Sequence, residues 1–258
     1  MRDLPWRATR DPWRILVAEI MLQQTQVPRV IPRWLAFGAA YPDPPAFAAA
    51  PLGAVLRDWQ GLGYPRRARN LHDAARAMVA EHGGTVPDDL AALEALPGIG
   101  PYTARAVLAF AHERDVAVVD TNIARVLARV AGERLTMRRA QGAADALVPA
   151  GSGWVWNQVL MDLGATVCRP TPRCADCPLA PSCAWHVAGH PAPDPAAGSA
   201  GVSTRQAPYA GSARQARGAV LRALHDGPRP AAAFDAEIVA GLVADRLVTR
   251  RGDTVELP

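Results

Sequence analysis

The chain has 258 residues, which is enough for one large or two modest domains with a hydrophobic core. Half of its residues are apolar, yet no apolar run reaches the 18 residues that a membrane-spanning helix needs. The N-terminal residues also lack the apolar region of a secretory signal, so we expect a cytoplasmic protein.

The positive charge of the chain has a single source. The formal net charge is +4, and all 28 basic side chains are arginine because the sequence contains no lysine. A Schiff-base nucleophile must be an amine, and here only the α-amino group of the chain is available. The composition therefore excludes enzymes that depend on a lysine Schiff base.

Helical patterns dominate the first 170 residues. Asp11 and Pro12 predict an N-cap followed by proline at the first helical position, and the helix from Trp13 to Gln24 is apolar on nearly every side, as buried helices are. Because short Pro- and Gly-marked connections separate the helices and no strand alternation precedes residue 190, the sequence predicts an all-α domain. Further helices are expected at residues 28–40, 47–60, 66–82, 88–95, 102–112, 121–131, 137–148 and 153–166.

The composition changes near the C-terminus. Residues 186–213 are rich in Pro, Ala, Gly and Ser, which is typical of a linker. Residues 214–258 then contain two helical patterns and a hairpin pattern around Arg-Gly-Asp. This order predicts a small C-terminal module, either a winged helix or a structural tail.

A glycine-rich turn separates two of the expected helices. Gly98 and Gly100 would expose backbone N–H groups where the next helix begins, and in a basic protein such a turn is suited to a DNA phosphate. Asp120 follows about twenty residues later, after an apolar run, where it would lie beside the sugar of an extruded nucleotide. An ordinary interhelical turn followed by an aspartate N-cap would leave the same pattern.

Four cysteines fall within sixteen residues, at Cys168, Cys174, Cys177 and Cys183. In a cytoplasmic protein such a cluster indicates a metal site rather than disulfides. The spacing C-x5-C-x2-C-x5-C permits a four-thiolate zinc site or an iron–sulfur cluster. Since only one CxxC pair is present, the spacing favours the cluster.

Several further motifs occur in a fixed order along the chain. Together they resemble the adenine DNA glycosylases of the MutY type, within the helix-hairpin-helix family that includes endonuclease III, and the resemblance runs from residue 3 to about residue 185. The motifs are Leu4-Pro5-Trp6-Arg7, Glu19 to Val27, Gly61-Leu62-Gly63-Tyr64, Arg67 to Leu71, the glycine turn, Asp120-Thr121-Asn122, Trp156-Asn157-Gln158, Met161 to Ala165, and the four cysteines.

The resemblance implies a two-lobed, all-α glycosylase domain over residues 1–185. A six-helix lobe would span about residues 14–120, and a cluster lobe about residues 121–185 together with the N-terminal residues. The four cysteines would hold a [4Fe–4S] cluster. The implied activity is hydrolysis of the N-glycosidic bond of adenine paired with 8-oxoguanine or guanine, by a monomer acting on double-stranded DNA.

Two carboxylates carry the implied chemistry. Glu19 is the only charged residue between Ile15 and Val27, on a helix that we expect to be buried, and burial would keep a proton on its carboxyl group near neutral pH. A structural glutamate in the core, paired with an arginine such as Arg7, would give the same sequence pattern. By resemblance Glu19 protonates adenine and Asp120 stabilises the oxocarbenium ion, the division of roles found in retaining glycosidases.

Other residues take their roles from the resemblance. Tyr102 stands where endonuclease III carries its lyase lysine, which implies base removal without strand scission, and Asn122 would orient Asp120 or the sugar. Gln24, Thr25, Leu62 and Tyr64 would wedge the duplex and contact the opposite base. Trp6, Arg7, Leu22 and Asp162 would line the adenine pocket, although Trp6 and Leu22 are equally ordinary core residues. Phosphate contacts are expected from Gly98, Gly100 and the arginines at positions 66, 67 and 69, although these arginines could also form a solvated helix face.

The chain departs from the family pattern in three places. Five residues rather than six separate the first two cysteines, Asp-Thr-Asn replaces the usual Asp-Gly-Asn, and only about 70 residues follow the cysteines where relatives carry a larger Nudix-like domain. Two alternative functions stay open: a mismatch thymine glycosylase of the same fold and a non-catalytic DNA-binding module. The run Gln23 to Gln26 favours adenine, because thymine-specific relatives carry basic residues there.

Overall fold

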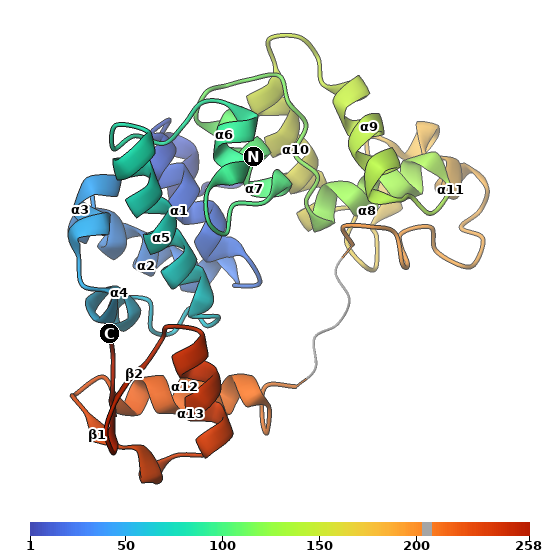
Figure 1. Cartoon of the computed structure of the whole chain (residues 1–258). Coiled ribbons are helices and arrows are strands. Elements are labelled where there is room, and N and C mark those ends of the chain that lie inside the picture. The colour runs from blue at the N-terminus through green and yellow to red at the C-terminus, as the bar shows by residue number, and fades with distance from the viewer. Residues whose placement is uncertain (203–207) are drawn as a thin grey trace. The chain divides into compact units, whose positions relative to one another are not determined.

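The computed structural model describes residues 1–202 and 208–258 (Figure 1). The chain divides into two compact units, and both are discontinuous in sequence. The first unit combines Met1–Arg10 with Pro101–Arg205, and the second combines Asp11–Gly100 with Gln206–Pro258.

The second unit is built on a helical core. Asp11 begins it as predicted, because its side chain accepts hydrogen bonds from the backbone N–H groups of Trp13 and Arg14 and so caps α1. An aromatic cluster that includes Phe37 and Phe47 packs between the helices, with ring centroids 5.1 Å apart. The helices are α1 (Pro12–Leu22), α2 (Val27–Ala40), α3 (Pro44–Ala49), α4 (Leu52–Asp58), α5 (Arg66–Glu81) and α6 (Leu90–Ala95).

One predicted helix is in fact two. The expected helix at residues 47–60 is divided into α3 and α4 at Pro51, which acts as the N-cap of α4. Proline disfavours helical geometry at the residue before it, and Ala50 is accordingly extended.

The C-terminal module lies in the second unit (Figure 1). It contains α12 (Ala213–Ala223), α13 (Ala236–Ala244) and the strands β1 (Arg229–Pro230), β2 (Thr249–Arg251) and β3 (Thr254–Glu256), which form an antiparallel sheet in the order β1-β3-β2. The predicted hairpin is confirmed, with its turn at Gly252. The module packs against the helices through two ion pairs, Arg66–Asp245 and Arg246–Asp73, each 2.6 Å long. Its identification as a winged helix stays a prediction.

The first unit is also helical. It contains α7 (Pro101–Phe110), α8 (Thr121–Ala131), α9 (Met137–Leu147), α10 (Gly153–Thr166) and α11 (Ala184–Val187), preceded by the short 3-10 helix η1 (Pro5–Ala8). The loop between α10 and α11 carries the cysteines and two further 3-10 turns, η2 (Cys174–Asp176) and η3 (Ala180–Ser182). Helix α8 packs against α9, α10 and α11, so it is the central element of the unit.

Two predicted boundaries differ from the structure. The unit boundary falls at residues 100/101 rather than 120/121, because α7 packs on α10 in the first unit. The expected linker at residues 186–213 is wrong for its first half, because residues 186–202 fold onto the first unit. Asp194 forms an ion pair of 2.6 Å with Arg129, and the Ala200 N–H donates to the Leu135 carbonyl. Residues 203–207 lie outside the described residues.

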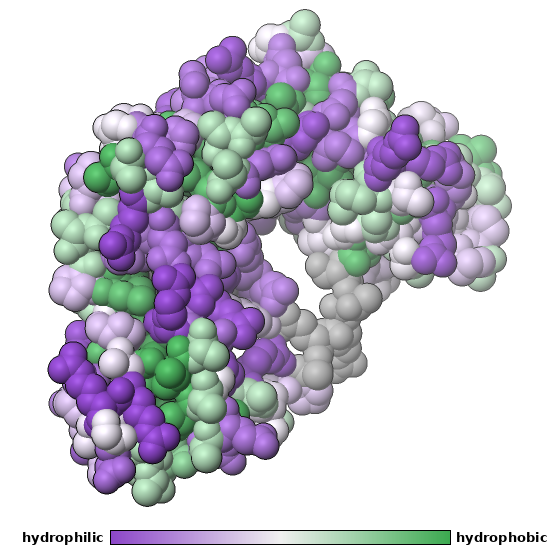
Figure 2. Space-filling view, viewed as in Figure 1, coloured by the Kyte–Doolittle hydropathy of each residue, from purple (hydrophilic) through white to green (hydrophobic). Residues whose placement is uncertain are grey.

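The described helices include none that is both long and apolar enough to cross a membrane. The face shown in Figure 2 mixes hydrophilic and hydrophobic residues over both the helices and the C-terminal module.

The crossing of α8 and α10 gives a stability prediction. A Cβ atom at Gly164 would lie 2.6 Å from Asn122 Cβ and 2.8 Å from the Asn122 carbonyl oxygen, so Gly164→Ala must separate the two helices. We expect a loss of about 1–3 kcal/mol in the free energy of unfolding, measured by thermal or urea denaturation. Gly142→Ala is the control, because a Cβ atom there meets nothing within 4 Å on α9 and should stabilise by about 0.5–1 kcal/mol. Equal effects of the two substitutions would contradict the close helix crossing.

Candidate active site and cysteine-lined cavity

The carboxyl group predicted to be catalytic in the second unit is Glu19. It lies on α1, whose residues from Ile15 to Met21 are all buried, and Glu19 itself is only 7% exposed. The buried helix that the sequence predicted is therefore present. Leu22 at the end of this helix is half-buried.

Arg67 connects the end of α1 to two loops. Its Nη1 donates to the carbonyl oxygens of Ile20 and Met21, at 2.8 and 3.0 Å, which belong to the last turn of the helix. Its Nη2 donates to Thr25 Oγ1 at 3.0 Å and to the Leu62 carbonyl at 2.9 Å. Burial lowers the pKa of Arg67 to about 10, so the side chain keeps its charge at neutral pH. The expected phosphate contact is wrong for Arg67, because its donors point into the protein.

The two loops that Arg67 joins carry the residues expected to contact the opposite base. Thr25 Oγ1 donates to the Leu62 carbonyl at 3.1 Å, so the loops are also bonded directly. Gln24 and Tyr64 have positive φ angles of 56° and 47°, which are uncommon for residues with a side chain. Gln24 is exposed, whereas the Leu62 side chain is buried and only 3% exposed.

The glycine turn behaves as its sequence indicates. Gly98 has φ 77°, and a Cβ atom there would lie 2.6 Å from Asn70 Cβ. Glycine is therefore required at this position by both conformation and space. A Cβ atom added at Gly100 would meet nothing within 4 Å, so the backbone there is open to an approaching group. Tyr102 follows on α7 and is half-buried.

Asp120 is the predicted catalytic carboxylate of the first unit. Its Oδ1 accepts hydrogen bonds from the backbone N–H groups of Asn122 and Ile123 at 2.9 and 2.7 Å, and its Oδ2 accepts one from Asn122 Nδ2 at 2.8 Å. Asp120 is therefore the N-cap of α8, which is the ordinary structural role that the sequence pattern also allowed. The same hydrogen bonds fix the orientation of its carboxyl group. Burial raises the pKa of Asp120, and these hydrogen bonds oppose that shift.

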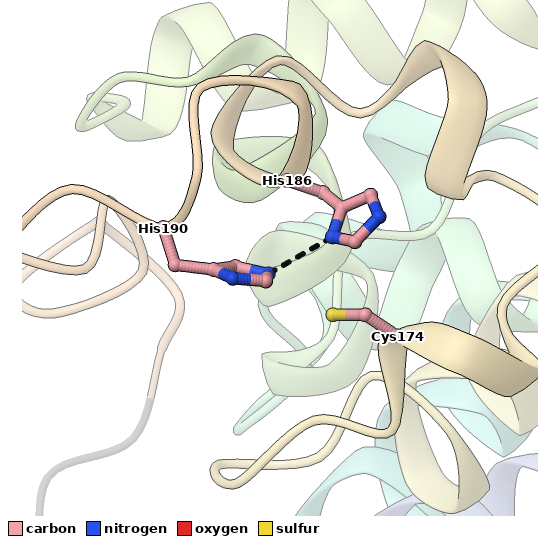
Figure 3. A group of neighbouring side chains, drawn as sticks. All are labelled: Cys174, His186 and His190. Carbon is pink, nitrogen blue, oxygen red and sulfur yellow. Dashed lines mark hydrogen bonds between the residues drawn. The ribbon is translucent and has the colours of Figure 1, made fainter.

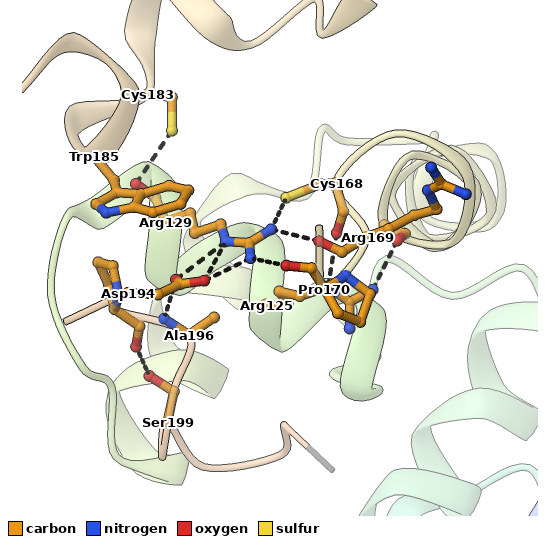
Figure 4. Close-up of polar contacts among 12 residues, drawn as sticks. Arg125, Arg129, Cys168, Arg169, Pro170, Cys183, Trp185, Asp194, Ala196 and Ser199 are labelled. Carbon is orange, nitrogen blue, oxygen red and sulfur yellow. Dashed lines mark hydrogen bonds and ion pairs between the residues drawn. The ribbon is translucent and has the colours of Figure 1, made fainter. Parts of the chain in front are cut away.

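Two buried arginines on α8, Arg125 and Arg129, reach the cysteine loop (Figure 4). Arg125 Nη2 donates to Asn122 Oδ1 at 2.9 Å, and its Nε donates to the Cys168 carbonyl at 2.6 Å. Arg129 Nη1 lies 3.4 Å from Cys168 Sγ, and its guanidinium also pairs with Asp194. No role was predicted from the sequence for Arg125 and Arg129. Their positions on α8, one and two turns after Asn122, could have pointed to them, but their partners are distant in sequence.

The four predicted metal ligands gather around one cavity. Its lining includes Cys168, Cys174, Cys177 and Cys183 together with Arg129 and Trp185. A single tetrahedral zinc would hold thiolate sulfurs about 3.8 Å apart, since each Zn–S bond is about 2.3 Å long. In the part of the chain that the structure describes, the cysteine sulfurs do not form a group of ligand atoms within 4.8 Å of one another. Four thiols that line one cavity are a donor set that a zinc ion or an iron–sulfur cluster accepts.

A second arrangement of ligand atoms occurs beside this cavity. Among the described residues, Cys174, His186 and His190 bring one sulfur and two imidazole nitrogens within 4.8 Å of one another (Figure 3). His186 Nδ1 and His190 Nε2 are 3.0 Å apart. A sulfur with two imidazoles is a donor set that zinc accepts. The metal site was predicted from the cysteine spacing alone, so the two histidines, which follow the last cysteine, were not included.

The N-terminal residues are tied to α10 by Asp162. Arg7 donates to both of its carboxylate oxygens, at 2.9 and 2.8 Å, and Arg2 donates to Oδ2 through its backbone N–H and to Oδ1 through Nε. Trp6, between them, is 8% exposed. Burial opposes ionisation of Asp162, yet these donors hold its pKa well below the usual range. The structure thus shows Arg7 and Asp162 as an ion pair that ties the N-terminal residues to α10, and their place in an adenine pocket stays a prediction.

Hydrogen bonds join several of the predicted site residues within each unit. In the second unit Arg67 joins the last turn of α1, the helix that carries Glu19, to the loops that carry Thr25 and Leu62. The first unit joins Asp120, Asn122 and the cysteine loop through Arg125.

Comparison with known proteins gives consistent matches. Residues 17–144 match the family described as HhH-GPD superfamily base excision DNA repair protein. The chain is 42% identical to the adenine DNA glycosylase of Mycobacterium tuberculosis, over 98% of this chain and 87% of that protein. Among solved structures, it is similar to a thermostable thymine-DNA glycosylase (TM-score 0.70, 34% identity, 72% of this chain and 89% of that chain). It is also similar to endonuclease III in a non-covalent DNA complex (TM-score 0.64, 25% identity, 70% and 86%).

The ion pairs of Asp162 give a prediction with a defined pH range. Because the pKa of Asp162 is depressed in the folded protein, its stabilisation is complete above its unfolded pKa of about 3.9 and is lost as the pH falls through the folded value. Asp162→Asn should therefore destabilise by roughly 2–3 kcal/mol at pH 5–8, and the difference from wild type should shrink below pH 4. Thermal unfolding across this range measures it. Glu113→Gln, which breaks the exposed pair with Arg10, should change little, and a pH-independent Asp162→Asn effect would contradict the assignment.

Proposed function

This chain belongs to the HhH-GPD superfamily of base excision DNA repair proteins, and we propose that it is a monomeric DNA glycosylase that hydrolyses the N-glycosidic bond of adenine opposite 8-oxoguanine or guanine. The observation that carries the proposal is the 42% identity to an adenine DNA glycosylase over 98% of the chain. The buried Glu19 and the hydrogen-bonded Asp120 supply the two carboxyl groups that this reaction needs.

Glu19 acts as the general acid. Adenine leaves readily only when a ring nitrogen accepts a proton, so the site needs a donor that is held away from water. Glu19 lies on a helix whose neighbouring residues are buried, which disfavours its charged form. After the base departs, the resulting carboxylate positions the attacking water.

Asp120 stabilises the positive charge that develops on the sugar. Its carboxylate is fixed by three hydrogen bonds, so it loses little entropy when it faces an oxocarbenium ion. The carboxylate form is the active one. Because burial raises the pKa of Asp120, we expect activity to fall on acidification at a higher pH than an ordinary aspartate would give.

The reaction ends with base removal. Strand scission by the lyase route requires an amine nucleophile, and the sequence has no lysine. Tyr102, in the first turn of α7, stands by resemblance where endonuclease III carries its lyase lysine. A lysine-dependent lyase step is therefore excluded, and only the α-amino group of the chain could form a Schiff base.

DNA contacts are assigned to the loops. Gln24, Thr25, Leu62 and Tyr64 enter the duplex beside the opposite base, and the open backbone around Gly100 binds a phosphate. Trp6, Leu22 and the Arg7–Asp162 pair line the adenine pocket. Leu62 must leave its buried position to enter the duplex.

A mismatch thymine glycosylase is the second candidate function. The similarity to a thermostable thymine-DNA glycosylase, with 34% identity over 72% of this chain, favours it. The uncharged run Gln23 to Gln26 and the longer match to an adenine-specific protein favour adenine. Adenine or thymine release from duplexes with A opposite 8-oxoguanine or T opposite G decides between them. A purely DNA-binding module would release neither base.

The cysteine-lined cavity is assigned to a [4Fe–4S] cluster. Its four cysteine donors line one cavity, and their spacing in the sequence suits this cofactor. A bound cluster would cross-link residues 168–183 and fix the loop against α8. Cys168, Cys174, Cys177 and Cys183 would hold it, and no residue of the proposed chemistry lies among them.

The first test concerns the two carboxyl groups. Glu19→Gln and Asp120→Asn should each lower the single-turnover rate of adenine release by about a hundredfold or more, while DNA affinity changes little. Both substitutions preserve size and remove only the proton or the charge. Glu94→Gln, an exposed glutamate on α6, should leave the rate unchanged. Near-normal rates in either catalytic variant would show that the wrong carboxyl group was named.

The second test concerns the cofactor. Purified protein should contain about four irons and four labile sulfides per chain. His186→Ala with His190→Ala should keep this iron, whereas Cys174→Ser should lose it. One zinc per chain that disappears when the histidines are replaced would instead support the site formed by Cys174, His186 and His190.

A further inference from the structure

The C-terminal module is anchored on the first turns of α5. Asp245, at the end of α13, pairs with Arg66 and with Arg217, and its backbone carbonyl accepts a hydrogen bond from Arg69. Asp245 is 9% exposed. Burial opposes its ionisation, yet hydrogen bonds from Arg66 and Arg217 hold its pKa below the usual range. The anchor is therefore charged and intact at neutral pH.

A second contact reaches the loop just before α5. Arg214, in the first turn of α12, donates through Nη1 to the hydroxyl oxygen of Tyr64 at 2.8 Å. The Arg214 guanidinium carbon is also 5.9 Å from the centroid of the tyrosine ring, and that of Arg67 is 5.5 Å from it. Both distances lie in the range of cation–π attraction. The module thus holds the outer end of a side chain that is 150 residues away in sequence.

The loop of Tyr64 needs such support because of its backbone. Gly61, Gly63 and Tyr64 all have positive φ angles, at 92°, 75° and 47°. Glycine adopts this conformation freely, but tyrosine does so only where its surroundings impose it. Arg67 fixes the backbone of the loop through the carbonyls of Leu62 and Gly63, at 2.9 and 3.0 Å. Arg214 fixes the hydroxyl end, so the ring is held at both ends.

We propose that the C-terminal module positions Tyr64 through Arg214 and thereby sets how strongly the enzyme discriminates 8-oxoguanine from guanine opposite the adenine. This inference rests on the proposed function, in which Tyr64 contacts the opposite base. Arg214 is a positioning residue: it acts through the orientation of the tyrosine ring. The rate of bond cleavage itself depends on Glu19 and Asp120.

A double-mutant cycle tests the proposal. The measurement is the single-turnover rate of adenine release from duplexes with A opposite 8-oxoguanine and with A opposite guanine, expressed as a ratio. Arg214→Ala should lower this ratio about threefold or more, the size expected for coupled residues in contact. Tyr64→Phe, which removes only the hydroxyl, should lower it similarly. The double variant should be no worse than the more affected single variant, because both remove one interaction.

Two controls make the outcome decisive. Arg222→Ala changes an exposed arginine on the same helix and should leave the ratio at the wild-type value. Arg214→Lys retains a charged donor and should restore part of the ratio, and it replaces Arg214→Ala if thermal unfolding shows that the latter is not folded.

An unchanged ratio in Arg214→Ala, or effects that multiply in the double variant, would overturn the inference. A wild-type enzyme that releases no adenine from either duplex would overturn the proposed function instead.

Discussion

The guanidinium of Arg67 is the interaction on which the candidate site of the second unit depends. The last turn of any helix leaves carbonyl oxygens without intrahelical partners, and at the end of α1 Arg67 supplies donors to them. The same cation binds Thr25 Oγ1 and the carbonyls of Leu62 and Gly63. Its position near the C-terminus of α1 also suits the helix dipole. One half-buried side chain therefore fixes the helix that carries Glu19 and both loops that we assign to DNA.

Arginine serves a similar purpose in the first unit. Arg7, Arg125 and Arg129 all direct their planar donors to carboxylates or backbone carbonyls inside the protein. A guanidinium can satisfy several acceptors at once and stays charged when partly buried, whereas the amine of lysine is a point charge with fewer fixed directions. A chain whose basic residues are all arginine can thus hold many irregular loops with ionic contacts. The positive net charge consequently overstates how many arginines are available to a nucleic acid.

Local signals in the sequence predicted local structure well. The caps at Asp11 and Asp120 and the helix at residues 121–131 are present as expected, because capping and hydrophobic periodicity act within a few residues. The inward direction of Arg67, the Asp194–Arg129 pair and the anchor at Asp245 were not predictable, because each partner is brought close only by the folded chain. The error in the linker has the same cause. Its Pro- and Gly-rich composition is typical of a flexible segment, yet the Asp194–Arg129 ion pair and backbone hydrogen bonds hold it to the first unit.

The discontinuity of both units constrains how the molecule can be divided. The chain passes between the units three times, after residues 10, 100 and 205, so neither unit is a continuous stretch of sequence. A single proteolytic cut between the units cannot release one of them, because each is still covalently joined to the other through the remaining connections. During synthesis, α1 to α6 emerge well before α12 and α13, which complete the same unit. The ribosome has by then delivered all of α7 to α11, so the second unit reaches its final set of contacts only after the first unit's helices have left the exit tunnel.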